Sequence, residues 1–515
     1  MNIKETFETS EKTYKKVNMC PGHGMGGRHP SRKGLDQLSG HDDPGMFGRM
    51  FPGLSALDVP DNKLQALAEA MLDPDPTDSS LDNPGIPGGY TYFGQFVDHD
   101  ITLDLSSLSD KKRDPLGLEN FRTPALDLDN VYGLGPDGSP HLYARNPADP
   151  SQRGPKLLIG RNINVDFGGI TGDFANDLPR SPEGVALIGD PRNDENLLVA
   201  QTHLAFLKFH NAVCDKLQSE GVAAEQLLTE ARKTVTYHYQ WMVLHDWMER
   251  LCGEGATDRI LNDGRQYYRF KKTPYMPVEF SVAAYRLGHS MVRQRYSHNR
   301  IFADTGFDLL FAFSGLSGDI IGNLAPQPPT GPTPVSVLPS NWIIDWRRFH
   351  DLDRPSSMPF NPSRKLDPLL VEELHNLPGG GGNLAFRNLK RGVSLGLPSG
   401  QDVAREMGVA NALTADEIAT GPDGEEAKRQ GLHESTPLWY YILKEAQVKE
   451  AGDRLGPVGA AIVSEVFVGL IHGDQQSFLW QEGKDWKPSL PAATPGTFTM
   501  ADMLRFIGDI NPLGD

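Results

Sequence analysis

Four side chains that could do chemistry stand within six positions in the segment YTYFGQFVDHDITLD, residues 90–104: Gln95, Asp98, His99 and Asp100. On a helix, Gln95 and His99 lie four residues apart and can point into one pocket, whereas Asp100 is turned by about 100° toward other neighbours. A neutral imidazole can accept a proton and return it, so a pocket lined by His99 could carry acid–base chemistry. Without further context, the DHD triplet is also typical of a solvated helix face.

A second segment, TPALDLDNVYGLGPDG at residues 123–138, places hard oxygen ligands at alternate positions. Thr123, Asp127 and Asp129 supply a hydroxyl and two carboxylates, which are ligands that calcium prefers. The segment is not an EF-hand, because the sixth position counted from Asp127 is Tyr132 rather than glycine. The sequence therefore leaves two interpretations open, a calcium loop or a turn rich in Asp and Gly.

An arginine and a glutamate stand at the expected start of a long helix. In GDPRNDEN, residues 189–196, Arg192 comes three positions before Glu195. An arginine there could stabilise a developing anion, and a glutamate in the first turn suits the helix dipole. The alternative is an ordinary capping arrangement with a salt bridge.

A histidine projects from an apolar wall in VEFSVAAYRLGHSMV, residues 278–292, which the periodicity predicts to be helical. Arg286 lies one turn before His289 on that face. An imidazole in such a setting suits metal coordination through one nitrogen while the other donates to a fixed acceptor. Further on, Asn388 and Arg391 stand three apart on a predicted helix that a glycine and a proline end. A packing histidine and an ordinary polar helix face remain the alternatives.

Helical periodicity dominates the segments that must position these residues. Apolar side chains recur at helical spacing in a long helix that starts at the N-cap candidate Asp194, and in residues 231–251, 278–296 and 458–473. Alternating apolar and polar strands are scarce, so the fold is predicted to be mainly α with little β. Residues 1–84 are rich in Gly, Pro, Asp and Ser and predict a wrapping arm of low regularity, with one short helical stretch around Leu64 to Met71.

Composition excludes several classes of function. The chain has 515 residues, with 67 acidic and 50 basic side chains and a formal net charge of −17. No basic run is longer than Lys111–Arg113, so a surface that tracks nucleic-acid phosphates or binds anionic lipid is disfavoured. The first residues lack an apolar signal-peptide core, and no apolar run approaches the ~20 residues that span a bilayer. We therefore expect a soluble protein with a cytoplasmic address, or one exported without a cleaved signal.

Taken together, the five segments resemble those of the animal-type haem peroxidases, the peroxidase–cyclooxygenase superfamily. They occur in the family's order with their internal spacing intact, over roughly residues 85–485. The closing stretch GPVGAAIVSEVFVGLIHGDQQSFLW, residues 456–480, looks like that of bacterial members. The resemblance implies a haem b group and a calcium ion. Because the five segments must converge on one haem, we expect a single large helical catalytic domain over residues 85–515, with long loops.

The resemblance implies a role for each motif by position. On the distal side, His99 and Arg192 match the catalytic pair, and Gln95 matches the glutamine that holds water or a halide over the iron. On the proximal side, His289 matches the iron ligand and Asn388 the residue that hydrogen-bonds its other nitrogen. The remaining haem-binding positions match the two carboxylates that form ester bonds and two arginines near the haem edge and propionates, namely Asp98, Glu195, Arg286 and Arg391.

The resemblance also implies a set of calcium ligands, namely Asp100, Thr123, the carbonyl of Ala125, Asp127 and Asp129. Aspartate at 129 replaces the more usual serine and adds charge to the site. Asn196 stands where one mammalian member has a methionine bonded to the haem, so a sulfonium link cannot form here.

The implied reaction is the reduction of hydrogen peroxide through an oxyferryl intermediate, followed by oxidation of small organic donors or halides. His99 would move a proton between the two peroxide oxygens, and Arg192 would stabilise charge as their bond breaks. Two alternatives stay open, a haem-dependent fatty-acid dioxygenase and a non-catalytic calcium-stabilised binding module. The dioxygenases have a radical-forming tyrosine three residues before the proximal histidine. This chain has Arg286 there, with Tyr285 turned by about 100°, so a peroxidase is expected.

Overall fold

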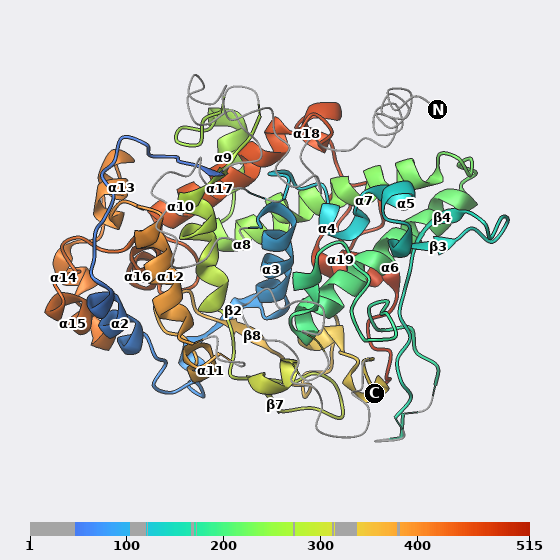
Figure 1. Cartoon of the computed structure of the whole chain (residues 1–515), viewed down its shortest axis with the longest axis horizontal. Coiled ribbons are helices and arrows are strands. Elements are labelled where there is room, and N and C mark those ends of the chain that lie inside the picture. The colour runs from blue at the N-terminus through green and yellow to red at the C-terminus, as the bar shows by residue number, and fades with distance from the viewer. Residues whose placement is uncertain are drawn as a thin grey trace, which may run out of the picture.

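The computed structural model describes residues 47–103, 120, 122–165, 169–170, 172–270, 273–311, 314, 337–377 and 382–515. Helices predominate in this part of the chain (Figure 1). The longer ones are α2 (Asp61–Ala70), α3 (Gly89–Ile101), α6 (Leu197–Ser219), α7 (Leu227–Met242), α9 (Ala256–Asp263), α12 (Leu384–Ser394), α13 (Gly400–Glu406), α15 (Gly421–Arg429), α16 (Leu438–Glu450), α17 (Pro457–Gly473) and α19 (Met500–Ile507). Shorter ones are α4 (Asp129–Tyr132), α5 (Gly135–Gly138), α8 (Met248–Cys252), α10 (Val278–Ser281), α11 (Glu372–His375), α14 (Ala415–Ile418) and α18 (Phe478–Gln481).

The strands of the described residues are short and pair two by two. One pair is parallel, β1 (Phe47–Gly48) with β5 (Met276–Pro277). Three pairs are antiparallel: β2 (Asp82–Pro87) with β8 (Pro362–Arg364), β3 (Tyr143–Arg145) with β4 (Arg153–Leu157), and β6 (Arg295–Tyr296) with β7 (Thr305–Gly306). The prediction of a mainly α fold with little β is confirmed. Among the helices described, none is both long enough and apolar enough to cross a membrane.

The expected N-terminal arm is described from residue 47 onward, and residues 1–46 lie outside the described residues. Its short helical stretch is α2, which begins at Asp61 and packs against α12 and α15. The two residues of β1 pair with β5, which is more than 200 positions away in the sequence. The division of the chain at residue 84 stays a prediction.

Helix α3 lies near the middle of the molecule and packs against α6 (Figure 1). Eleven of its 13 residues are buried, including His99 and Asp100, so the interpretation of the DHD triplet as a solvated helix face is wrong. Gly94 allows this burial, because a Cβ at that position would come within 2.7 Å of the indole of Trp247. The helix ends at Ile101, after which the hydroxyl of Thr102 donates to the carbonyl of Asp98 at 2.9 Å.

Helix α6 begins later than the sequence predicted. Its N-cap is Asn196, whose side chain accepts from the backbone N–H of Val199 at 3.0 Å. The predicted cap, Asp194, instead lies in a 3₁₀ turn, η5 (Pro191–Asp194), where it accepts two hydrogen bonds of 2.8 Å from Arg180. Asp194 is thus engaged by Arg180, and Asn196 provides the N-cap of α6.

Two other predicted helices are confirmed. Residues 231–251 fall in α7, a π-helical turn η6 (Val243–Trp247) and α8, which follow one another directly. Residues 458–473 lie in α17, which is buried along most of its length and packs against α8, α9 and α16.

The predicted helix over residues 278–296 is wrong, because it is broken at Ala283. Helix α10 ends at Ser281, and a 3₁₀ turn, η7 (Ala284–His289), follows, with non-helical dihedrals at Arg286. The rings of Phe280 and Tyr285 stack at 4.9 Å and 8°. Five positions apart on a straight helix they would diverge by about 140°, so this contact requires the break.

Candidate functional site

The imidazole of His99 contacts Asn193, the residue that follows Arg192. Its Nδ1 lies 2.8 Å from Oδ1 of Asn193, whose amide nitrogen lies 3.0 Å from Nδ1 of His203. Because an amide oxygen only accepts, Nδ1 of His99 carries the proton and Nε2 keeps its lone pair. Burial, with a further contribution from Arg192, lowers the pKa of His99 to about 3. The ring is therefore a neutral base aimed by Asn193.

Arg192 ties the turn before α6 to the end of α3. Its Nη2 donates to the carbonyls of His99 at 3.0 Å and Thr102 at 2.6 Å. The same guanidinium donates two hydrogen bonds to Asp190, from Nε to Oδ1 at 3.1 Å and from Nη2 to Oδ2 at 2.8 Å. Burial alone would raise the pKa of Asp190, but the guanidinium groups of Arg192 and Arg122 hold it well below its usual range. A full positive charge thus sits beside His99.

Gln95 and Glu195 meet beside this pair. The amide nitrogen of Gln95 donates to Oε1 of Glu195, and the amide of Asn196 donates to Oε1 of Gln95 at 3.1 Å. Burial raises the pKa of Glu195 to about 7. Burial also raises the pKa of Asp98, against the opposing charges of Arg286 and Arg192. Two carboxyl groups are therefore kept close together inside the protein.

The amide nitrogen of Asn388 lies 2.9 Å from Nδ1 of His289. Asn388 is contributed by α12 and is buried. Burial, together with the charges of Arg286 and Arg387, lowers the pKa of His289 to about 3. The break at Ala283, rather than a straight helix, is what places His289 against α12.

The charge of Arg286 links the residues around His99 with those around His289, because it acts on both Asp98 and His289. Burial is the largest influence on the pKa of Asp98, Glu195, Arg286 and His289. The same four side chains, and Gln95, nevertheless keep accessible surface. From this combination we infer that the five side chains line an internal cavity.

Arg391 lies one turn after Asn388 on α12 and is buried, which lowers its pKa. Sequence reasoning missed four residues that the structure brings to this site, namely Arg122, Asp190, Asn193 and Arg387. Two of them, Asp190 and Asn193, lie within GDPRNDEN, so their proximity to Arg192 was the available signal.

Three of the five predicted calcium ligands come together. The carboxylates of Asp100, Asp127 and Asp129 offer oxygens that lie within 4.8 Å of one another. Within the described chain, Oδ1 of Asp100 and the hydroxyl of Thr123 are buried without a hydrogen-bond partner. Burial, and then the two neighbouring aspartates, raise the pKa of Asp100 well above its usual range. Orphaned buried oxygens among three carboxylates fit a hard divalent cation.

The loop that carries these ligands is locally strained. Leu128, between the two aspartates, has a positive φ of 58°, which a non-glycine residue rarely adopts. Its side chain is fully buried, and its backbone N–H donates to Oδ2 of Asp100 at 3.2 Å. Ala125 lies two positions before Asp127 and is buried. Core packing of Leu128 and the bond to Asp100 thus hold the aspartates in register.

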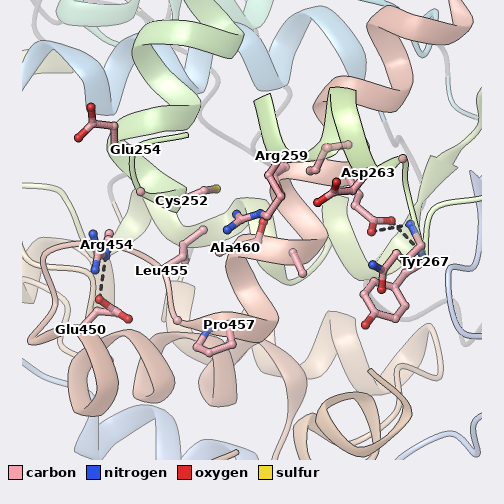
Figure 2. Close-up of a pocket in the computed structure, with 18 residues that line it drawn as sticks. Cys252, Glu254, Arg259, Asp263, Tyr267, Glu450, Arg454, Leu455, Pro457 and Ala460 are labelled. Atoms are coloured by element: carbon pink, nitrogen blue, oxygen red, sulfur yellow. Dashed lines mark hydrogen bonds and ion pairs between the residues drawn. The ribbon is translucent and has the colours of Figure 1, made fainter. Parts of the chain in front are cut away.

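A separate open pocket of about 590 Å³ lies between α8, α9 and α17 (Figure 2). Its lining includes Cys252, Arg259 and Arg454 but none of the predicted site residues. Burial raises the pKa of the Cys252 thiol, so it is not a reactive nucleophile. Arg454 pairs with Glu450 at 2.7 Å (Figure 2).

Comparisons with known proteins match this arrangement. A family model described as animal haem peroxidase matches residues 109–491, which begins after α3. The peroxidasin homolog pxn-2 of Caenorhabditis elegans is 24% identical over 383 residues, covering 71% of this chain and 27% of that protein. The chain spans between about a quarter and a half of the length of the curated relatives it matches first.

Two solved structures share the fold. Peroxidase A from Dictyostelium discoideum has a TM-score of 0.58 at 15% identity, covering 96% of this chain and 98% of that one. The fatty acid alpha-dioxygenase of Oryza sativa has a TM-score of 0.56 at 16% identity, covering 91% and 80%. Likeness at this level of identity concerns the fold alone, and it does not separate the two activities.

Proposed function

The chain belongs to the animal haem peroxidase family, and on that premise we propose that it is a haem peroxidase that reduces hydrogen peroxide and oxidises small organic donors or halides. The observation that carries the proposal is the pairing of His99 with Asn193 beside Arg192. This arrangement places a neutral base beside a fixed positive charge, which is what heterolysis of a peroxide requires.

The residues around the cavity fit a haem. A bound haem would supply the redox centre at which peroxide is reduced. We assign its iron to Nε2 of His289. An amide can turn its oxygen toward the ring, so that Nδ1–H of His289 donates to Asn388 and Nε2 keeps its lone pair. Arg286 and Arg391 are the cations assigned to the haem edge and propionates.

The proton steps fall to the distal residues. With Nδ1 committed to Asn193, Nε2 of His99 would accept a proton from one oxygen of peroxide and return it to the other. Arg192 is anchored to Asp190 and to the end of α3, so its charge is in place before negative charge develops. Gln95, held by Glu195 and Asn196, is assigned to orient water or a halide.

Two further assignments extend the proposal. Asp98 and Glu195 would form the ester bonds to haem, since both carboxyls are enclosed in the protein interior and the charge of Asp98 acts on Glu195. Calcium would bind Asp100, Thr123, the carbonyl of Ala125, Asp127 and Asp129, supported by the clustered carboxylates and the partnerless oxygens of Asp100 and Thr123. Membership of the bacterial branch and a cytoplasmic or signal-independent exported location stay predictions.

Fatty-acid dioxygenation is the second candidate, because a dioxygenase shares the fold. The side chain of Tyr285 argues against it. Its hydroxyl accepts from Nε1 of Trp247 at 2.8 Å and donates to the carbonyl of Gly94 at 3.2 Å. Its ring stacks on Phe280 inside the core. This phenol is committed to packing, and Arg286 stands at the position where the dioxygenases have their tyrosine.

One experiment tests the proposal directly. The full chain expressed with added haem is expected to show a Soret band and to oxidise a phenol only when hydrogen peroxide is present. In His289→Ala the haem iron loses its proposed ligand, so the absorption spectrum of the ferric haem should differ from that of the wild type. His99→Ala should keep the Soret band but lose turnover. Normal haem binding and turnover in His289→Ala would contradict the assignment.

A further inference from the structure

A line of buried charged side chains joins the three-aspartate cluster to Arg192. Nη1 of Arg122 donates to Oδ1 of Asp129 at 3.0 Å, and Nε of the same guanidinium donates to Oδ2 of Asp190 at 2.9 Å. Asp190 in turn holds Arg192 through both of its carboxylate oxygens. All four side chains are at most 9% exposed, so the line is screened from solvent along its whole length.

A divalent cation would offset the excess of carboxylates in this line. Asp100, Asp127, Asp129 and Asp190 contribute four negative charges when ionised, and Arg122 and Arg192 contribute two positive charges, which leaves −2. A divalent cation cancels that remainder. Buried charges are stable only when they are paired, so cation binding must redistribute the pairing along the line.

Asp129 connects the three-aspartate cluster to the line of buried charged side chains. It belongs to the carboxylate cluster and is also an acceptor of Arg122. A serine at this position could offer an oxygen to a cation, but it would carry no charge to hold a guanidinium. The aspartate in this chain therefore creates a connection that a serine would not make.

At the other end, Arg192 donates to the carbonyls of His99 and Thr102, where α3 ends. Its Nη2 is shared between these carbonyls and Asp190. Any change in the hold of Asp190 on Arg192 therefore alters how readily this guanidinium turns toward a ligand beside His99.

We propose that Arg122 and Asp190 are positioning residues that couple cation binding at Asp100, Asp127 and Asp129 to the affinity of the distal site for ligands. A bound cation neutralises part of the charge of Asp129, so Arg122 interacts more strongly with Asp190. Asp190 then interacts less strongly with Arg192. The coupling is positive, and it is reciprocal between the two sites. It deepens the proposed function, since it assumes that the cavity beside Arg192 binds the ligands of a haem.

The first test needs no haem. Calcium binding to the full chain is measured by calorimetry for the wild type, Asp190→Asn, Arg122→Gln and the double variant. Asp190 is not one of the proposed cation ligands. Asp190→Asn is nevertheless expected to weaken calcium binding by about 5-fold or more, because Arg122 then interacts with Asp129 alone. In the Arg122→Gln background the same substitution should change calcium affinity by less than about 2-fold. Additive effects, or no effect of Asp190→Asn, would overturn the proposal.

The second test reads the distal end in the haem-loaded protein. Cyanide, which binds ferric haem, is titrated with and without calcium, and calcium is expected to tighten it by about 5-fold in the wild type. Arg122→Gln and Asp129→Ser should bring that factor close to 1, while Asp129→Ser still binds calcium. Arg180→Gln is the matched control, because Arg180 is a buried arginine that pairs with two aspartates, Asp177 and Asp194, outside the line.

The outcomes separate the two proposals. Absence of a Soret band or of cyanide binding would count against the haem peroxidase assignment and leave the calorimetric cycle to decide the coupling. The coupling would be overturned if the cyanide affinity of the haem-loaded wild type did not depend on calcium, or if Arg122→Gln kept the full calcium effect on that affinity. Neither result would contradict the proposed peroxidase activity.

Discussion

The amide oxygen of Asn193 lies 2.8 Å from Nδ1 of His99, so the tautomer of the distal imidazole is set by the residue directly after Arg192. The amide nitrogen of Asn193 lies 3.0 Å from Nδ1 of His203, so this amide lies between two imidazoles. The base and the charge that flank the cavity are thus positioned by consecutive residues of one turn.

Replacing this amide should slow the reaction with peroxide. In Asn193→Ala, Nδ1 of His99 loses its acceptor and both tautomers become accessible, so we expect the rate constant for peroxide reaction to fall roughly 10- to 100-fold with haem still bound. Stopped-flow absorbance at the Soret band measures it. Asn176→Ala is the control, since Asn176 is a buried asparagine bonded to Asp509 and Gln201. An unchanged rate in Asn193→Ala would refute the role of the amide.

Removal of calcium should destabilise the chain. A ligand that binds only the folded state at 100 times its Kd stabilises it by about 2.7 kcal/mol, so a chelator should lower the unfolding free energy by about that amount at such a concentration. Thermal unfolding with and without chelator measures the shift. Asp127→Asn should abolish most of it, whereas Asp137→Asn, an exposed aspartate of the same segment, should leave it intact. A chelator-independent midpoint would argue against a cation site.

Covalent attachment of haem is tested by mass spectrometry. After acid denaturation in organic solvent, haem should remain on the wild-type chain once peroxide has been supplied. Glu195→Gln and Asp98→Asn should each leave a single attachment, and the double variant should release haem fully. Release of haem from the wild type would show that neither ester forms, without touching the assignment of His289.

Stability should fall as the solution is acidified because of His298. This side chain is fully buried, neither ring nitrogen has a hydrogen-bond partner among the described residues, and burial lowers its pKa to about 3. In the unfolded chain His298 therefore binds a proton near pH 6.5, whereas in the folded chain it binds one only near pH 3. Stability is lost as the pH falls between these values.

Denaturant unfolding at pH 7 and pH 5 measures this effect. One such histidine contributes a loss of about 2 kcal/mol between the two pH values, so His298→Phe should reduce the wild-type loss by about that much. His141→Phe, at an exposed histidine, should leave the pH dependence unchanged. Equal pH dependence in His298→Phe and the wild type would contradict the prediction.

Tyr285→Phe separates peroxidase from dioxygenase. The substitution leaves Nε1 of Trp247 buried without its acceptor, which should cost about 1–3 kcal/mol of unfolding free energy. Phenol oxidation with peroxide should remain within about 2-fold of wild type, because the phenol is committed to the core rather than the cavity. Oxygen uptake with a polyunsaturated fatty acid that disappears in this variant would favour the dioxygenase.

The sequence located most of the residues of the site, but it did not show what holds them. Gln95 and His99 share a face of α3 because helical spacing places them there, and that inference needed no tertiary information. The continuous helix expected over residues 278–296 was wrong, because the chain breaks at Ala283 and the ring of Phe280 stacks on that of Tyr285. Similarly, Asp194 is engaged by Arg180, so the start of α6 passes to Asn196.

By itself, the sequence determined the mainly α character, the order of the motifs and the family to which they belong, since these depend on local periodicity and on residue types at fixed spacing. Only the tertiary structure decided which partners fix each functional group. Asn388 reaches His289 across 99 positions, and Arg122 reaches Asp190 across 68. Contacts of that separation are selected by the packing of the whole core, and no local pattern encodes them.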